Sequence, residues 1–154
     1  MQILNSQESA ILRNRDLLTN RKHYDIYVGL SSGKGVGLFS SVSIPQQAVI
    51  AESVARRVQV CAKSLDPVVS QYLFVDPAQY CGSRPAHDSI IACSEITLLN
   101  HSETPNSRVI WEYVSTEILR AKLISIREIH PSEELTIFYT DADAYQGLRS
   151  LSKK

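Results

Sequence analysis

Short β-prone runs, each ending at a turn signal, are the feature that most limits the folds open to this chain. Tyr24, Ile26 and Val28 alternate with other residues, and the run ends at Gly29 and a Ser-Ser-Gly turn. Similar runs follow at 36–40, 49–52, 54–62, 72–75, 90–91, 108–126 (with a hairpin turn at 115–117) and, after a tight turn at 130–133, 135–139. The long βαβ units of a doubly wound parallel sheet do not occur, so the sequence predicts a mainly β (α+β) fold.

Helical character is limited to the two ends of the chain. Residues 6–20 place a few apolar side chains among polar ones at helical spacing, which predicts a short amphipathic helix. The polar tail 140–154 has room for one helical turn within 142–148. A length of 154 residues without a low-complexity linker favours one domain with a true core.

Charge and cysteine spacing exclude several classes of protein. Sixteen basic and sixteen acidic residues leave no net charge, so we expect no direct nucleic-acid partner and no anionic membrane. The N-terminus is too polar for a secretory signal, and we expect an intracellular protein, cytoplasmic or nuclear. Cys61, Cys81 and Cys93 form no CxxC pair, so we expect small buried thiols and no metal site.

The glycine-rich stretch SGKGVGLF at 32–39 resembles a phosphate-binding loop, but its spacing is wrong. A Walker loop needs four residues between its first glycine and Gly-Lys, and only three separate Gly29 from Gly33. Gly37 comes too early for the GxGxxG pattern, and a β-like run follows it where a helix would be needed. Taken alone, the stretch is either a strand-to-strand turn or a loop for another kind of ligand.

Two polar motifs downstream complete the candidate site. Asn100, His101 and Asn106 surround a proline in LLNHSETPN at 98–106, and EELTIFY at 133–139 ends on Tyr139. Each motif has a structural alternative, because asparagines near proline form turns, a histidine can be buried in the core and a tyrosine can pack on a strand. Likewise His87-Asp88 resembles a catalytic dyad but lies in a loop without a nucleophile motif, and a loop role is favoured.

Together the motifs resemble the SET-domain protein-lysine methyltransferases, and they occur in that family's order. The matching segments are GVGLF at 35–39, IPQQAVIAE at 44–52, NHSETPN at 100–106 and the closing run from Ala121 to Tyr139. The resemblance covers residues 24–145 and implies a SET-domain β-clip of small curled sheets with a knot-like core. It divides the chain into a helical extension (1–23), the SET domain (24–145) and a tail (146–154).

The resemblance also implies a ligand, a partner and roles for individual residues. The cofactor would be S-adenosyl-L-methionine, and the partner a protein, histone or non-histone, that presents a lysine. The cofactor contacts implied are Lys34, Gly35, Val36 and Gly37 in the loop, Asn100, His101, Tyr139 and, over the adenine, Tyr145. Tyr139 would also be the catalytic tyrosine, placing an amine that must first lose its proton, because a free lysine has a pKa of about 10.4.

Departures from the family pattern keep a second hypothesis open. Many members carry a tyrosine soon after the glutamate that corresponds to Glu52, where this chain has Ser-Val-Ala-Arg. A zinc-binding cysteine segment after the domain is absent from the sequence. Tyr24, Tyr27 and Tyr72 could line the lysine channel or pack on a sheet surface, and Trp111 and Tyr113 are expected in the core or in a cross-strand pair. The alternative function is a degenerate SET domain that binds a partner protein without methylating it.

Overall fold

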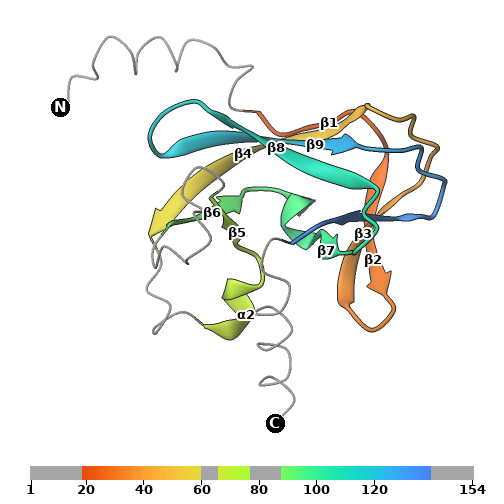
Figure 1. The fold of residues 1–154 in the computed structure, drawn as a ribbon, viewed down its shortest axis with the longest axis horizontal. Helices are drawn as coiled ribbons and strands as arrows, with labels where there is room; N and C mark the ends of the chain where they lie inside the picture. Colours follow the sequence, from red (N-terminus) through yellow and green to blue (C-terminus); the bar gives the residue numbers. More distant parts are fainter. Residues whose placement is uncertain (1–18, 60–65, 77–87, 140–154) are drawn as a thin grey trace.

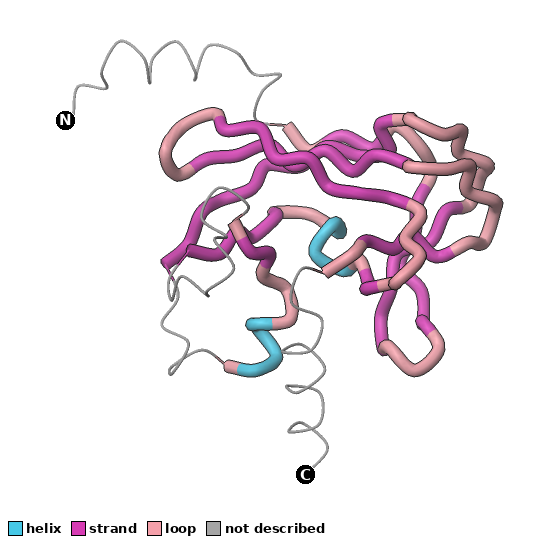
Figure 2. The backbone as a smooth tube through the Cα atoms, in the orientation of Figure 1, coloured by secondary structure: helices cyan, strands magenta, loops and turns pink. Residues whose placement is uncertain are grey.

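A computed structural model describes residues 19–59, 66–76 and 88–139, and these form two β-sheets (Figures 1 and 2). The larger sheet has the strand order β5-β6-β4-β9-β8, with β1 paired to β4. Its strands are β1 (Arg21–Lys22), β4 (Val49–Gln59), β5 (Phe74–Val75), β6 (Asp88–Ala92), β8 (Ser107–Tyr113) and β9 (Ile118–Ser125). The smaller sheet, in the order β2-β3-β10-β7, contains β2 (Ile26–Ser31), β3 (Gly35–Ser40), β7 (Asn100–His101) and β10 (Glu134–Ile137). Two short helical turns, α2 (Pro67–Ser70) and the 3₁₀ turn η2 (Glu95–Leu98), connect strands.

The mainly β prediction is confirmed, while several strand boundaries differ from it. The two runs expected at 49–52 and 54–62 form one strand, β4, which pairs with β9 and, further along, with β6. β2 continues through Gly29 to Ser31, because Gly29 has Gly37 as its partner on β3 and leaves room for the Phe39 ring. The run at 72–75 yields only the two-residue β5, since Asp66 caps a helical turn that begins at Pro67. The helix expected at 6–20 and the turn at 142–148 lie outside the described residues, apart from 19–20.

Apolar residues on the inner sides of the sheets form the core. β9 alternates strictly between buried and half-buried residues, which is the pattern of a strand with one face inward. Trp111 packs on this core with its ring edge-on to Phe74, whereas Tyr113 is 48% exposed and lies opposite Leu119 on β9. Cys93 is exposed, so the prediction of a buried thiol is wrong for it, and Cys61 and Cys81 lie outside the described residues. No helix in the described ranges is long and apolar enough to span a membrane.

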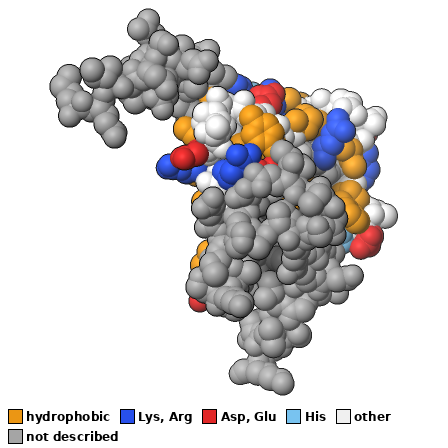
Figure 3. All heavy atoms as spheres, turned by 60° about the vertical axis from the view of Figure 1, so that its left-hand side comes forward, with side chains coloured by type: hydrophobic (Ala, Val, Ile, Leu, Met, Phe, Trp, Pro, Cys, Tyr) orange, Lys and Arg blue, Asp and Glu red, His pale blue; other side chains and the backbone are white. Residues whose placement is uncertain are grey.

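Charged side chains of both signs alternate across the outer face of the larger sheet. Glu112 on β8 bonds to Lys122 (2.6 Å) and lies 3.5 Å from Arg120, both on β9. Arg120 also approaches Glu52 on β4 at 3.6 Å. Figure 3, which views another side of the molecule, likewise shows basic and acidic side chains interspersed among the described residues. These charges therefore compensate one another locally.

The knot-like core is the place where the NHSETPN segment meets the final strand. β10 lies between β3 and β7, antiparallel to β3 and parallel to β7. Three strands that are far apart in the sequence therefore meet side by side. The buried Asn106 side chain fastens it, because its amide donates to the Glu134 carbonyl (2.7 Å) and accepts from the Thr136 N–H (2.9 Å). The same amide donates to the Glu133 carboxylate at 3.0 Å. This confirms the core architecture expected from the sequence.

The Glu133 carboxylate makes the stability of this core sensitive to acid. Burial would raise its pKa, but hydrogen bonds from Arg127, the His130 N–H and Asn106, with the Arg127 charge, lower the pKa to about 2. Because the folded pKa lies below the unfolded value of about 4.3, the stabilisation is present above pH 5 and disappears as the pH falls toward 2. We expect the free energy of unfolding to fall by an amount on the order of 1 kcal/mol over that window. The effect is no larger because the partly exposed Arg127 is screened by solvent. Urea unfolding of wild type and Glu133→Gln at pH 7, 5 and 3 measures it, and an equal acid response of both proteins would contradict it.

Candidate functional site

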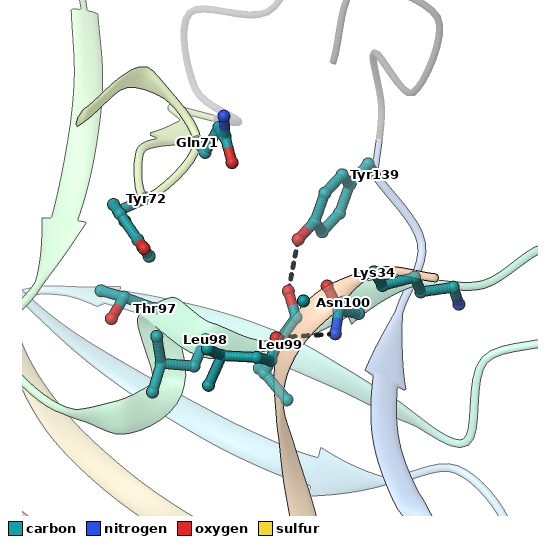
Figure 4. Close-up of a pocket in the computed structure, with 10 residues that line it drawn as sticks. Lys34, Gln71, Tyr72, Thr97, Leu98, Leu99, Asn100 and Tyr139 are labelled. Carbon is teal, nitrogen blue, oxygen red and sulfur yellow. Dashed lines mark hydrogen bonds between the residues drawn. The ribbon is translucent and has the colours of Figure 1, made fainter. Parts of the chain in front are cut away.

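A cavity of about 220 Å³ lies beside the knot-like core, where four segments of the chain meet (Figure 4). Its walls come from the turn between β2 and β3 with the start of β3, the segment after α2, the end of η2 with β7, and the second residue after β10. The lining residues are Lys34, Gly35, Val36, Gln71, Tyr72, Thr97, Leu98, Leu99, Asn100 and Tyr139. Five of them are among the eight residues that the sequence assigned to the site: Lys34, Gly35, Val36, Asn100 and Tyr139.

The glycine-rich turn presents backbone to this cavity. Gly33 and Gly35 have φ values of 70° and 84°, a region that favours glycine, and a Cβ on either would meet nothing within 4 Å. The Lys34 side chain extends away from the cavity (Figure 4), and its ammonium donates to the His101 carbonyl at 2.8 Å. The Lys34 side chain therefore connects the turn to β7, and the backbone of Lys34 is the part that lies at the cavity wall.

Asn100 has a fixed orientation at the base of the cavity. Its side-chain nitrogen donates to the Val36 carbonyl at 3.0 Å and to the Glu134 carboxylate at 2.7 Å. These two bonds use both N–H groups of the amide, and the residue is only 5% exposed. The amide oxygen is directed toward Tyr139, as Figure 4 shows, and provides a hydrogen-bond acceptor in the wall.

His101 lies behind the cavity and supports Tyr139. Its Nδ1 accepts the backbone N–H of Tyr139 at 2.9 Å, and its Nε2 lies 2.9 Å from the Glu103 carboxylate. Because Nδ1 is an acceptor and Nε2 faces a carboxylate, this geometry requires the proton on Nε2. The ring also packs against Phe138 and Tyr139 at centroid distances of 5.2 and 5.4 Å. His101 is thus placed to position the last residue of the site through its backbone.

Tyr139 brings a hydroxyl group into the cavity. The hydroxyl donates to the Leu99 carbonyl oxygen, the bond drawn in Figure 4. A phenol oxygen can accept hydrogen bonds as well as donate one, so the group is of a kind that can contact a ligand from either role. The phenol ring is half-buried and packs on the hydrophobic core, which holds the hydroxyl in place.

Gly37 lies outside the cavity wall, against a carboxylate. A Cβ at this position would stand 2.4 Å from Glu134 Oε1 and 3.0 Å from Asn100 Nδ2. The second glycine of the GxG pair thus provides space for a charged side chain behind Asn100. Tyr145 lies outside the described residues.

The cavity also contains residues that the sequence did not assign to the site. Gln71 and Tyr72 stand across from Tyr139 (Figure 4), and Thr97, Leu98 and Leu99 form the floor. Tyr72 is one of the three tyrosines for which the sequence favours packing on a sheet surface and leaves a place in the lysine channel as the alternative. The structure separates them, because Tyr24 packs on the core and Tyr27 stacks on Phe39 at 5.7 Å.

The two glycines beside the site give a paired prediction. We expect Gly37→Ala to destabilise the protein by about 1–3 kcal/mol, because the new methyl group overlaps the Glu134 carboxylate. The new methyl group of Gly35→Ala contacts no neighbour, and we expect this variant to lose about 1 kcal/mol of stability because alanine is strained at the positive φ of this position. Chemical denaturation of both variants measures the difference, and a Gly35→Ala that is the less stable of the two would contradict the packing of Glu134.

The comparison with protein families identifies the class to which this fold and site belong. The family model described as SET domain matches residues 35–140, from the first glycine of the GxG pair to the residue after Tyr139. The chain belongs to the SET-domain family. A comparison with curated proteins gives no match.

Solved structures share the fold at low sequence identity. A Plasmodium falciparum protein provisionally classed as a histone methyltransferase aligns with a TM-score of 0.55 and 23% identity, over 76% of this chain and 94% of its own. KRYPTONITE, in a complex with DNA, an H3(1–15) peptide and SAH, aligns with a TM-score of 0.55 and 22% identity over 78% of this chain. This chain spans about a quarter (24%) of KRYPTONITE.

Proposed function

We propose that this SET domain is a methyltransferase that transfers a methyl group from S-adenosyl-L-methionine to a lysine side chain of a protein. The observation that carries the proposal is the convergence of the Asn100 amide oxygen and the Tyr139 hydroxyl on one cavity. Both groups are held by hydrogen bonds to the rest of the protein, so they are already oriented before a ligand enters.

The donor and acceptor groups fit the amino-acid end of that cofactor. The Asn100 oxygen suits an ammonium group, and backbone N–H groups in the part of the wall formed by Gly35 and Val36 would suit a carboxylate. The volume of about 220 Å³ is below the ~300 Å³ at which pockets for whole drug-sized ligands begin. The described residues therefore account for the amino-acid moiety, and we assign Lys34, Gly35, Val36, Asn100 and Tyr139 to its binding.

The chemistry requires a neutral amine and good alignment. When bound, the cofactor supplies a methyl group on a positively charged sulfur, which is open to in-line displacement. An apolar channel disfavours the ammonium form of lysine and so favours loss of its proton. Tyr139, whose own proton is bonded to Leu99, can accept an N–H of the amine and direct its lone pair. Tyr139 thus holds the nucleophile without competing with it.

The solved neighbours support a protein as the substrate. One of the KRYPTONITE structures contains an H3 peptide and SAH, and the Plasmodium protein is provisionally classed as a histone methyltransferase. We infer that this chain also acts on a protein lysine, in a histone or in another protein, inside the cell in the cytoplasm or nucleus.

A specific observation favours the second candidate, a degenerate domain that only binds a partner. Ser53 follows Glu52, where many family members carry a tyrosine, and it is completely buried with its hydroxyl bonded to the Val54 carbonyl at 2.8 Å. That position therefore supplies no hydroxyl to a lysine channel. Tyr72 supplies an aromatic hydroxyl to the same cavity as Tyr139 from a different segment.

Transfer of a radiolabelled methyl group to proteins of a cell extract separates these functions. We expect the wild type to label protein and Tyr139→Phe to do so at a rate lower by tenfold or more. Each tenfold loss of rate corresponds to about 1.4 kcal/mol of activation free energy. Tyr27→Phe is the matched control, because Tyr27 stacks on Phe39 away from the site and should retain full activity. Equal rates for Tyr139→Phe and wild type would refute the role of Tyr139, and cofactor binding without any labelling would establish the degenerate domain.

A further inference from the structure

A half-buried carboxylate lies directly behind Asn100 and has no role in the function proposed above. Glu134 on β10 accepts from Asn100 Nδ2 at 2.7 Å with one oxygen and from Ser31 Oγ at 2.8 Å with the other. Ser31 and Asn100 are 7% and 5% exposed. The chain Ser31–Glu134–Asn100 therefore joins β2, β10 and β7, and Gly37 on β3 provides the space in which the carboxylate lies.

The two acceptors decide which end of the Asn100 amide faces the cavity. If the amide were turned over, its oxygen would point at the Val36 carbonyl and the Glu134 carboxylate, and both contacts would be repulsive. A carboxylate also bonds more strongly than a neutral group and polarises the amide that donates to it. The amide oxygen toward the cavity thereby becomes a better acceptor for a cation.

We propose that Glu134 is a positioning residue, which holds the Asn100 amide so that its oxygen meets the ammonium group of a ligand, with Ser31 fixing Glu134 in turn. This inference rests on the proposed function only for the identity of the ligand. It assigns no contact between Glu134 and the ligand. The arrangement selects ligands with a free ammonium group over adenosyl compounds that lack it.

The first test uses the protein without ligand. In a sample labelled with ¹⁵N-asparagine, the side-chain amide signal of Asn100 is identified by its loss in Asn100→Ala. We expect its protons to exchange slowly with water in the wild type and in Glu134→Gln, which retains an acceptor, and at least tenfold faster in Glu134→Ala. Ser31→Ala should have a smaller effect. Unchanged exchange in Glu134→Ala would overturn the proposal. Should the alanine variant not fold, the wild-type signal still decides, because free exchange of the Asn100 side-chain amide in the wild type would also overturn it.

The second test measures coupling through S-adenosylhomocysteine binding. We expect Glu134→Ala to weaken binding about tenfold in the wild type and to have no further effect in Asn100→Ala, because its influence passes through that amide. An equal loss in both backgrounds would show a merely structural role. 5′-Methylthioadenosine, which lacks the ammonium, should bind wild type and Glu134→Ala equally. If the wild type binds neither compound, the proposed function fails, while the exchange measurement still decides the role of Glu134.

Discussion

Replacing Asn106 by alanine is expected to destabilise the protein by about 3 kcal/mol. The substitution removes three side-chain hydrogen bonds within the knot-like core, to Glu133, Glu134 and Thr136. It also leaves the Thr136 N–H, a buried donor on β10, without its acceptor, and an unsatisfied buried donor costs about 1–3 kcal/mol by itself. Urea unfolding at pH 7 measures the loss.

Asn20→Ala is the matched control for this prediction. Asn20 also bonds with its side chain to two backbone groups of distant segments, the Val54 N–H and the Cys93 carbonyl, but it is exposed. Because water replaces both bonds, we expect a loss below about 1 kcal/mol. Similar losses for the two variants would mean that Asn106 does not fasten the core in the way described.

Arg57→Ala is the second substitution with a large expected effect. We expect it to destabilise the protein by about 3–5 kcal/mol, because it removes a cation beside a buried carboxylate. Asp76 has no exposed surface and accepts from Arg57 at 2.7 and 2.9 Å and from the Tyr113 hydroxyl at 2.6 Å. Burial would lower the pKa of Arg57, but the hydrogen bond and charge of Asp76 raise it above its ordinary value, so the guanidinium stays charged. Arg57 also donates to the Thr116 carbonyl at 2.7 Å and lies over the Tyr113 ring.

The neighbouring Arg56 tests whether burial is the cause. Arg56 pairs with Glu117 at 3.4 Å, and both side chains are more than half exposed (64% and 69%). Arg56→Ala should therefore cost about 0–1 kcal/mol. Removing both partners in Arg57→Met/Asp76→Leu should restore much of the stability, because the buried carboxylate is removed together with Arg57. A double variant less stable than Arg57→Ala would contradict this explanation.

Local patterns were sufficient to predict most strands and the chain order of the motifs. The hairpin at 115–117 and the tight turn at 130–133 are confirmed, because each follows from nearby residues alone: Ser115 accepts from the Ile118 N–H, and Ser132 adopts a φ of 65°. Strand continuity was not predictable in this way. β4 runs without a break because β9 and β6 pair with successive parts of it, and those partners lie far away in sequence.

The candidate site shows the same division. Lys34, Gly35, Val36, Asn100 and Tyr139 belong to recognisable motifs, and the structure places all of them around one cavity. Tyr72 and Gln71 come from a segment without a motif, so only the folded chain shows that they face Tyr139. Glu134 looked like part of a turn, and its place behind Asn100 depends on the absent side chain of Gly37 on another strand.

Binding of S-adenosylhomocysteine, measured by titration calorimetry on the whole chain, tests the central proposal most directly. We predict saturable binding to one site with a dissociation constant below about 100 µM, equivalent to about 5.5 kcal/mol. Asn100→Ala should weaken it at least tenfold, because the acceptor for the ammonium is lost, while Asn20→Ala should bind as the wild type does. Absence of binding at high micromolar concentration, or equal binding by Asn100→Ala and the wild type, would contradict the assignment of this cavity as the cofactor site.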